Sequence, residues 1–396
     1  MKVRSGVIPD LSHIHLDGRT VALRLDHGRI AAIDAAPGPA THVILPLPID
    51  PHVHLDKTFT AYRCRALQPG LFGAIEAMAT DKVNWTEDDL RARIGQGLQD
   101  AYANGVSALR SHVDWTESGI TPLAWSVMAE AMQDWRGQMI LQRSALGSID
   151  LIGDADEAPK IAAAVAKDGD TLGAFVYRNA DLAAKLDRVF AQGARYDLRL
   201  DFHVDEGLDP EANGFDTIVA LTAKYRLAGR VLCGHACSLS IRPAGDVARV
   251  MDAAASAGVA LTVLPSTNLY LQDMTPGRTS RLRGLAPVHE LRAAGVQVLL
   301  GADNVADPFY PYGTYDPLDT LRIAAIAAHI EPAEWLDAIT TAPALAMGVP
   351  APKIAVGAPA DFILIAGADW RSAISNPRAP RQIYRAGLAT TQDAAA

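Results

Sequence analysis

Short apolar runs, each ending near a polar or charged residue, recur along the chain at intervals of roughly 30 residues. Runs of this length and composition are typical of strands in a parallel sheet, which is buried on both faces. We expect eight such strands, at residues 43–50, 107–114, 139–145, 172–177, 197–203, 230–235, 259–264 and 296–303.

The segments between these runs carry helix signals. Thr86 precedes three acidic residues and predicts an N-capped helix that continues to residue 102. Segments 246–257 and 288–294 each end at an Ala-Gly pair, and segment 317–330 is apolar with helical spacing. Strands that alternate with helices predict an α/β fold with a parallel sheet, and eight such units predict a closed, TIM-like (β/α)₈ barrel. An open doubly wound sheet is the alternative.

Both ends of the chain have a different pattern, in which short strands alternate with turn signals. Segments 21–25 and 29–33 near the N-terminus resemble segments 361–365 and 381–385 near the C-terminus. Neither end is long enough to fold alone. We therefore expect a small β-sandwich domain formed by residues 1–44 together with 356–396, and the (β/α)₈ barrel at residues 45–355.

Composition narrows the range of partners. The chain has 396 residues, 49% of them apolar, a formal net charge of −9 and only three cysteines. An acidic chain without a basic run has no surface for nucleic acid. No run of about 20 apolar residues and no apolar signal core is found, so we expect a cytoplasmic protein that does not enter membranes. A small molecule is the expected partner, and a homo-oligomer is possible.

The first candidate chemistry follows the first apolar run. His52 and His54 are two residues apart at the end of a predicted strand, so both side chains point to the same face. Two converging imidazoles most often share a metal ion. The same pattern occurs at His13 and His15, but these lie in a predicted edge hairpin and are expected to be surface residues.

Further polar residues stand at the ends of other predicted strands. His203 ends the fifth strand, His235 the sixth and Asp303 the eighth. In a (β/α)₈ barrel these ends meet at the catalytic face. A set of imidazoles with one carboxylate suits Zn²⁺ or Fe²⁺ rather than Ca²⁺ or Mg²⁺. The fourth strand has no lysine that could bridge two ions, so we expect one divalent metal ion.

Two other residues are candidates for the same face. Glu206 follows His203 closely and could carry a proton between water and substrate, whereas Asp205 is expected to be a loop or N-cap residue. His112, after the second strand, either lines the pocket or packs inside the barrel.

Taken together, these residues resemble the amidohydrolase superfamily, which has a His-x-His after the first strand, a His after the fifth and sixth strands and an Asp after the eighth. The resemblance covers most of the chain and is closest to the cytosine deaminase branch. The matching segments are 51–56, 110–114, 203–206, 268–272 and 303–311.

The resemblance implies a role for each residue. His52, His54, His203 and Asp303 would bind the metal, which would lower the pKa of a bound water, and Asp303 would accept that water's proton. Glu206 would protonate a ring nitrogen and His235 would hold the hydroxide or the oxyanion. In the substrate pocket, Leu146 stands where cytosine deaminases have Gln, Asn304 where they have Asp, and Phe309 where they have Trp. Lys57 could bind a substrate oxygen.

We therefore expect a metal-dependent deaminase that releases ammonia from a cytosine-like cyclic amidine. A second branch with similar segments at 54–60 and 303–304 releases alkylamines from s-triazines such as N-isopropylammelide, and this activity is the alternative. A third possibility is a non-catalytic oligomeric scaffold, but such proteins usually lose metal ligands.

Overall fold

The computed structural model describes residues 11–390, so residues 1–10 and 391–396 of the expected small domain lie outside the described residues. Within residues 11–390, eight parallel strands form the larger sheet in the order β12-β11-β10-β9-β8-β7-β6-β5. Their bounds are Ile49–Val53 (β5), Ala108–Asp114 (β6), Ile140–Leu146 (β7), Thr171–Val176 (β8), Leu200–Val204 (β9), Val231–His235 (β10), Ala260–Val263 (β11) and Gln297–Leu300 (β12).

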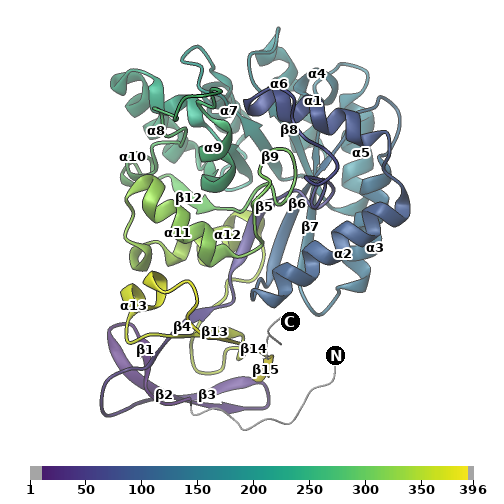
Figure 1. Cartoon of the computed structure of the whole chain (residues 1–396). Helices are drawn as coiled ribbons and strands as arrows, with labels where there is room; N and C mark the ends of the chain where they lie inside the picture. The colour runs from purple at the N-terminus through teal and green to yellow at the C-terminus, as the bar shows by residue number, and fades with distance from the viewer. Residues whose placement is uncertain (1–10, 391–396) are drawn as a thin grey trace.

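The first and last strands of this sheet meet. A parallel bridge joins Val53 to Asp303, and the Asp303 N–H donates to the His52 carbonyl at 2.9 Å. The expected (β/α)₈ barrel is thereby confirmed, with helices around the strands (Figure 1). Because the strands are parallel, all their carboxyl ends lie at one face of the barrel, where the active sites of such folds are found.

The helices lie where the apolar spacing predicts them. Thr86 caps α2 by accepting a hydrogen bond from the Asp89 N–H at 3.2 Å, and α8 ends at Gly258 in the left-handed region. The helices of the described chain are Gly70–Lys82 (α1), Glu87–Ala103 (α2), Leu123–Asp134 (α3), Ile149–Ile152 (α4), Ala158–Asp168 (α5), Leu182–Arg195 (α6), Gly214–Tyr225 (α7), Ala244–Ala257 (α8), Pro265–Leu271 (α9), Val288–Ala293 (α10), Pro317–Ala328 (α11), Thr341–Met347 (α12) and Trp370–Ser375 (α13).

The first apolar run divides between two sheets, although it was expected to be one strand. His42–Pro46 forms β4 of the smaller sheet, and the barrel begins only at Ile49. Pro48 has no N–H to donate to a neighbouring strand and therefore interrupts the ladder. The run passes from one sheet to the other at this proline.

The smaller sheet is built from both ends of the described chain, as expected. Its order is β15-β14-β13-β4-β1-β2-β3, so strands from the two ends are hydrogen-bonded neighbours. The remaining bounds are Ile14–Leu16 (β1), Arg19–Asp26 (β2), Arg29–Ala35 (β3), Phe362–Ala366 (β13), Arg381–Arg385 (β14) and Leu388–Thr390 (β15). It has its own apolar core, which includes Ile14, Ile30 and Phe362.

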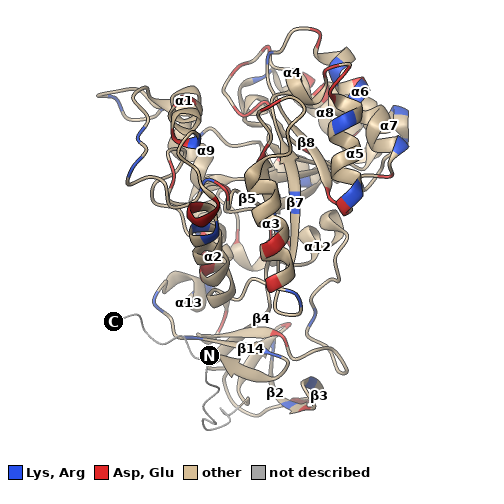
Figure 2. Ribbon diagram, turned by 90° about the vertical axis from the view of Figure 1, so that its right-hand side faces the viewer, with Lys and Arg blue, Asp and Glu red and all other residues tan. Residues whose placement is uncertain are grey.

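The smaller sheet lies below the barrel in Figure 1, whereas Figure 2 shows α1 and α9 at one side of the opposite end. The side chains of Ala344 and Met347 from α12 pack against Ile49 and Ala108 at the amino ends of the strands. Among residues 11–390, no helix has the length and apolar character needed to cross a bilayer.

Candidate metal centre and active site

The chain is irregular at the end of β5, where two of the predicted metal ligands lie. Pro51 has no N–H to give to a neighbouring strand, and the register between β5 and β6 shifts between Asp50 and Val53. Irregularities of this kind re-aim side chains next to active sites. His52 lies inside the irregular stretch and His54 lies one residue beyond the strand.

Buried neighbours hold His52 in place. Asp50 accepts hydrogen bonds from the N–H of His52 at 3.1 Å and of Ala302 at 3.2 Å, so it joins the first strand to the segment after the eighth. Burial raises the pKa of Asp50 to about 7. Two glycines leave room for the ring: a Cβ at Gly234 would lie 2.7 Å from His52 Cε1, and one at Gly301 would lie 3.1 Å from His52 Cβ.

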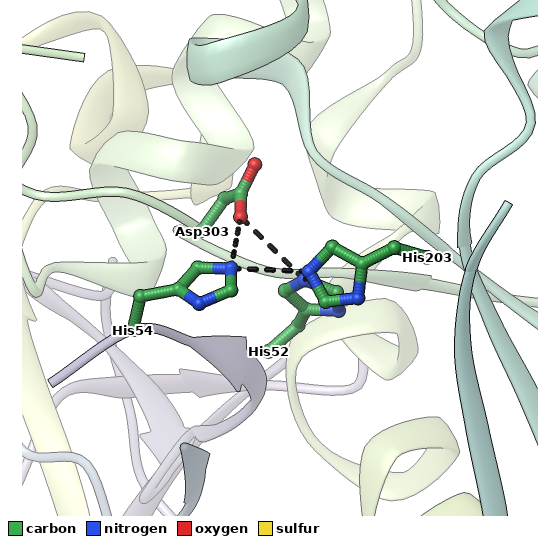
Figure 3. A group of neighbouring side chains, drawn as sticks. All are labelled: His52, His54, His203 and Asp303. Atoms are coloured by element: carbon green, nitrogen blue, oxygen red, sulfur yellow. Dashed lines mark hydrogen bonds and ion pairs between the residues drawn. The ribbon is translucent and has the colours of Figure 1, made fainter. Parts of the chain in front are cut away.

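Four of the predicted ligand atoms converge at the carboxyl ends of the strands (Figure 3). His203 Nε2 lies 3.0 Å from His52 Nε2 and 3.1 Å from His54 Nε2. Asp303 Oδ1 lies 3.1 Å from His54 Nε2 and 3.5 Å from His52 Nε2. The chain is strained at this point, because the φ of Asp303 is 63°.

This cluster fits a divalent metal ion. Ligand atoms about 2.0–2.1 Å from one ion lie about 3 to 3.5 Å from each other, which is the spacing found here. The four side chains are buried, and neither oxygen of Asp303 has a hydrogen-bond partner within the described chain. A buried carboxylate directed at imidazole nitrogens is costly unless a cation lies between them. Three nitrogens and one carboxylate are also the donor set of Zn²⁺ or Fe²⁺.

A second group of potential ligands, formed by His52, His112 and Asp201, does not fit a metal ion. Arg110 Nη1 lies 2.7 Å from Asp201 Oδ2, so a cation bound there would be next to a guanidinium. The rings of His112 and His52 are in tilted contact, with centroids 4.0 Å apart and planes inclined by 38°. His112 therefore packs inside the barrel, against the ring of His52.

Glu206 lies beside this cluster and is almost completely buried. Burial raises its pKa well above the usual range, and the charge of Asp303 adds to this effect. Glu206 is therefore protonated over a wider range of pH than an exposed carboxyl group. Asp205 has the different role that was expected, because it accepts hydrogen bonds from the N–H groups of Gly214 and Phe215 at the start of α7.

His235 lies next to Glu206, with 3.6 Å between His235 Nδ1 and Glu206 Oε1. Burial lowers the pKa of His235 to about 3, so the ring is neutral. The Asn268 side-chain amide donates to His235 Nδ1 at 2.9 Å. The proton of the neutral ring is therefore on Nε2, which has no partner in the described chain and can donate to a bound molecule.

Lys57 lies close to the cluster but is held by protein groups. Its Nζ lies 2.7 Å from Asp114 Oδ1 and 2.9 Å from His54 Nδ1. Burial opposes its charged form, but the carboxylates of Asp114 and Asp56 outweigh burial and raise its pKa. Asp114 also pairs with Lys82.

The other predicted substrate residues after β12 are buried as well. The Asn304 side-chain amide donates to Asp307 Oδ2 at 2.6 Å. Phe309 packs against Leu71 and Leu271, from α1 and α9, in a small apolar cluster at the barrel mouth.

Leu146 is the last residue of β7 and is buried, so its position offers only an apolar side chain. Gln142, four residues earlier, is within the strand, where it accepts from Arg110 and donates to the Met347 carbonyl at 3.1 Å. Neither residue therefore presents an amide at the barrel mouth.

Several residues that shape the site were not among the predicted set. Asp50, Arg110 and Asp201 each stand two residues before a site histidine, so they form the next inward layer of the barrel. That spacing is visible in the sequence. Asn268 lies in one of the segments that carry the family resemblance, but nothing in the sequence pairs it with His235.

The sequence model of the amidohydrolase family matches residues 73–386. A pterin deaminase of Rhizobium rhizogenes is 36% identical over 355 residues, which cover 87% of this chain and 80% of the relative. Among solved structures, 5-methylcytosine deaminase of Klebsiella pneumoniae superposes with a TM-score of 0.86 at 21% identity over 98% of both chains. N-isopropylammelide isopropylaminohydrolase of Burkholderia multivorans superposes with a TM-score of 0.77 at 24% identity over 93% of this chain and 94% of that chain.

Proposed function

Because the chain belongs to the amidohydrolase family, we propose that it is a hydrolytic deaminase of a cyclic amidine and that its preferred ring is a 2-amino-4-oxopteridine, the pterin ring. The observation that carries the proposal is the position of Glu206, a buried and protonatable carboxyl group beside the four-residue cluster and 3.6 Å from His235. A group in this place can exchange protons between water and a ring nitrogen.

His52, His54, His203 and Asp303 would hold a divalent ion, for which we propose one Zn²⁺ or Fe²⁺, and the ion would lower the pKa of a bound water towards neutrality. Glu206, which has taken one proton from the attacking water, gives a proton to the ring nitrogen next to the amine-bearing carbon as the oxygen of that water bonds to the carbon. Asp303 receives the remaining hydroxyl proton and passes it to the amino group. The carbon–nitrogen bond then breaks and ammonia leaves, and the next water supplies the next proton to Glu206.

His235 orients the reaction without changing its own charge. Because its pKa is lowered to about 3, it donates from a neutral ring through Nε2. A donor of this kind stabilises the oxygen as negative charge develops on it. Asn268 keeps the proton on Nε2 and is proposed as a positioning residue.

Two observations favour a pterin over cytosine. The pocket has Leu146 where cytosine deaminases have Gln, and Gln142 is bound to Arg110 and to a backbone carbonyl. A site without that amide loses the discrimination that a hydrogen bond to the pyrimidine would give. The relative with 36% identity is a pterin deaminase, whereas the cytosine deaminase structure is only 21% identical.

The test measures ammonia release by metal-replete enzyme from pterin, cytosine and 5-methylcytosine, and isopropylamine release from N-isopropylammelide. We expect pterin to have the highest kcat/KM and its product to be the 2,4-dioxo ring. Ammonia from cytosine but not from pterin would contradict the ring assignment and leave the reaction class intact. No ammonia from any of them would contradict the proposed deaminase.

Release of isopropylamine from N-isopropylammelide is the second candidate, because Lys57 and Asn304 match the alkylamine-releasing branch. In this structure, however, Lys57 pairs with Asp114 and Asn304 with Asp307, so neither is free to bind a triazine oxygen. Isopropylamine as the main product would show that one of these contacts opens.

A further inference from the structure

A cavity of about 690 Å³ lies at the outer side of the barrel mouth. Its walls are segment 61–70, which leads into α1, the end of α9 with the residues that follow it, and the loop around Pro308 and Tyr312. Figure 2 shows α1 and α9 together on this side of the barrel. A cavity of this volume holds a molecule larger than one six-membered ring.

The cavity walls continue the segments that carry the candidate site. The Thr58 hydroxyl donates to the Val305 carbonyl at 2.8 Å, and the Ala61 N–H donates to the Ala306 carbonyl at 2.9 Å. The two walls therefore leave the metal cluster side by side. Leu271 belongs both to the cavity wall and to the apolar cluster that covers Phe309, so the cavity adjoins the covered mouth of the site.

Aromatic side chains form much of the cavity surface. Tyr62, Tyr270 and Tyr312 line it, and the rings of Tyr270 and Tyr312 lie 6.2 Å apart at 81°. Tyr312 is 74% exposed and Leu67 is 92% exposed. Tyrosine faces of this kind stack against flat rings, and exposed apolar side chains around a hollow are typical of a binding surface.

The charge of the cavity is the opposite of the charge of the whole protein. The net charge is −9, yet among residues 11–390 Arg65 is the charged residue on the wall and none of the lining residues is acidic. Its neighbour Arg63 is bound to Asp81 and Asp89, whereas Arg65 has no ion pair within the described part of the chain. Arg65 is thus a free guanidinium that can bind a carboxylate.

We propose that this cavity is a second subsite, which binds an aromatic arm of the substrate that ends in a carboxylate, while the reacting ring lies at the metal cluster. The arm stacks on Tyr270 and Tyr312, and its carboxylate pairs with Arg65. The inference rests on the proposed deaminase and narrows its substrate class to rings that carry an anionic aromatic substituent.

The experiment compares kcat/KM for pterin, pteroic acid and the methyl ester of pteroic acid. The proteins are metal-replete wild type, Arg65→Gln, Arg65→Lys, and Arg249→Gln as a control at an exposed arginine of α8. We expect wild type to prefer pteroic acid over its ester. Arg65→Gln should lower kcat/KM for pteroic acid about threefold to tenfold, mainly through KM, to the value for the ester, as expected for a partly exposed charge pair. Arg65→Lys should retain part of the preference, and Arg249→Gln should keep all of it.

The inference and the proposed function fail in different ways. If pterin is deaminated but pteroic acid and its ester react equally, or if Arg65→Gln slows all three substrates alike, the subsite is wrong and the deaminase stands. If no substrate is deaminated, calorimetric titration of pteroic acid into wild type and Arg65→Gln decides the matter. Weaker binding by Arg65→Gln would support the subsite, and equal binding or none would overturn it.

Discussion

Glu206 and His235 are neighbours in the site, and burial shifts their pKa values in opposite directions. Burial favours the protonated form of the carboxyl group and keeps the imidazole neutral, because burial disfavours the charged form of each. The two groups are therefore suited to different roles, Glu206 as a proton carrier and His235 as a neutral hydrogen-bond donor. Asn268 adds what burial cannot, because it decides which ring nitrogen of His235 carries the proton.

The residue that the proposed reaction depends on most is Glu206. We expect Glu206→Gln to lower kcat by about 10² to 10⁴, since the amide keeps the shape of the side chain but cannot transfer the proton. Metal content and thermal stability should stay close to wild type, because Glu206 is not among the four converging ligands. Steady-state kinetics with metal analysis of the same samples measures both, and near-wild-type kcat would remove Glu206 from the mechanism.

A His-x-His pattern in the sequence is not enough to predict a metal site. His13 and His15 have the same spacing as His52 and His54, yet the metal-binding groups found in the described chain include only the second pair. Spacing along a strand brings two imidazoles together, but the third and fourth ligands come from strands about 150 and 250 residues away in sequence. The strand in which a pair lies therefore decides what it can bind.

At the scale of elements, the strands need small residues as well as ligands. The His52 ring can lie close to β10 only because Gly234 has no side chain, and a Cβ there would lie 2.7 Å from that ring. Two prolines shape the same part of the chain, because neither has an N–H to donate. Pro51 lies in the irregular stretch of β5 and changes the direction of the histidines, whereas Pro48 separates β5 from the smaller sheet.

We expect Gly234→Ala to weaken metal binding by more than about tenfold, because the added methyl group would displace the His52 ring, although Asp50 still holds the backbone N–H of His52. The matched control is Gly245→Ala in α8, where the nearest atom to an added Cβ lies 3.9 Å away. Competition with a chromophoric chelator measures both affinities. Equal affinities would mean that β10 moves aside and that His52 keeps its place.

Asp307, in the loop after β12, should make the stability of the folded protein depend on pH. Burial raises the pKa of Asp307 to about 7, although its carboxylate accepts hydrogen bonds from Asn304 and from the N–H groups of Phe309 and Tyr310. The folded protein therefore holds this proton more tightly than the unfolded chain does. The resulting stabilisation is complete below the unfolded pKa of about 4 and is lost as the pH rises through about 7.

Asp307→Asn should remove this dependence, since the amide does not titrate. The quantity to follow is the free energy of unfolding of Asp307→Asn minus that of wild type. This difference should rise in favour of the variant from pH 4.5 to pH 7.5, by no more than about 4 kcal/mol. Denaturant unfolding of both metal-replete proteins at the two pH values measures the change. Asp197→Asn is the control, because Asp197 is exposed and remote from this loop. A difference that does not change with pH would show that Asp307 ionises normally.

At the scale of the whole molecule, the barrel closes around the site. The four converging ligands come from β5 and the residue that follows it, from β9 and from the segment after β12, and the bridge between Val53 and Asp303 joins the first of these to the last. An ion bound here would therefore link strands that are distant in sequence. The smaller sheet, with an apolar core of its own, is proposed to be a separate domain formed by both chain ends.

Removal of the metal should affect stability as well as activity. Binding to the folded state alone stabilises it by about 4 kcal/mol when the free metal is about 1,000 times its Kd, so the chelated protein should unfold at a temperature several degrees lower. Thermal unfolding before chelation, after it, and after Zn²⁺ or Fe²⁺ is restored measures this effect. A non-catalytic scaffold would purify without stoichiometric metal and unfold at the same temperature in all three states.

The sequence by itself determined the periodic order of strands and helices and the union of the two chain ends, and it pointed to the residues that we propose carry the chemistry. These features follow from local spacing, and residues 203, 235 and 303 could be assigned to one face because parallel strands all end on the same side. Only the tertiary structure decided which polar side chains are already paired with other side chains of the protein. Lys57 and Asn304 looked available for a substrate, but Asp114 and Asp307 bind them. Such pairings join segments whose approach depends on how the barrel packs, and no spacing along the chain records them.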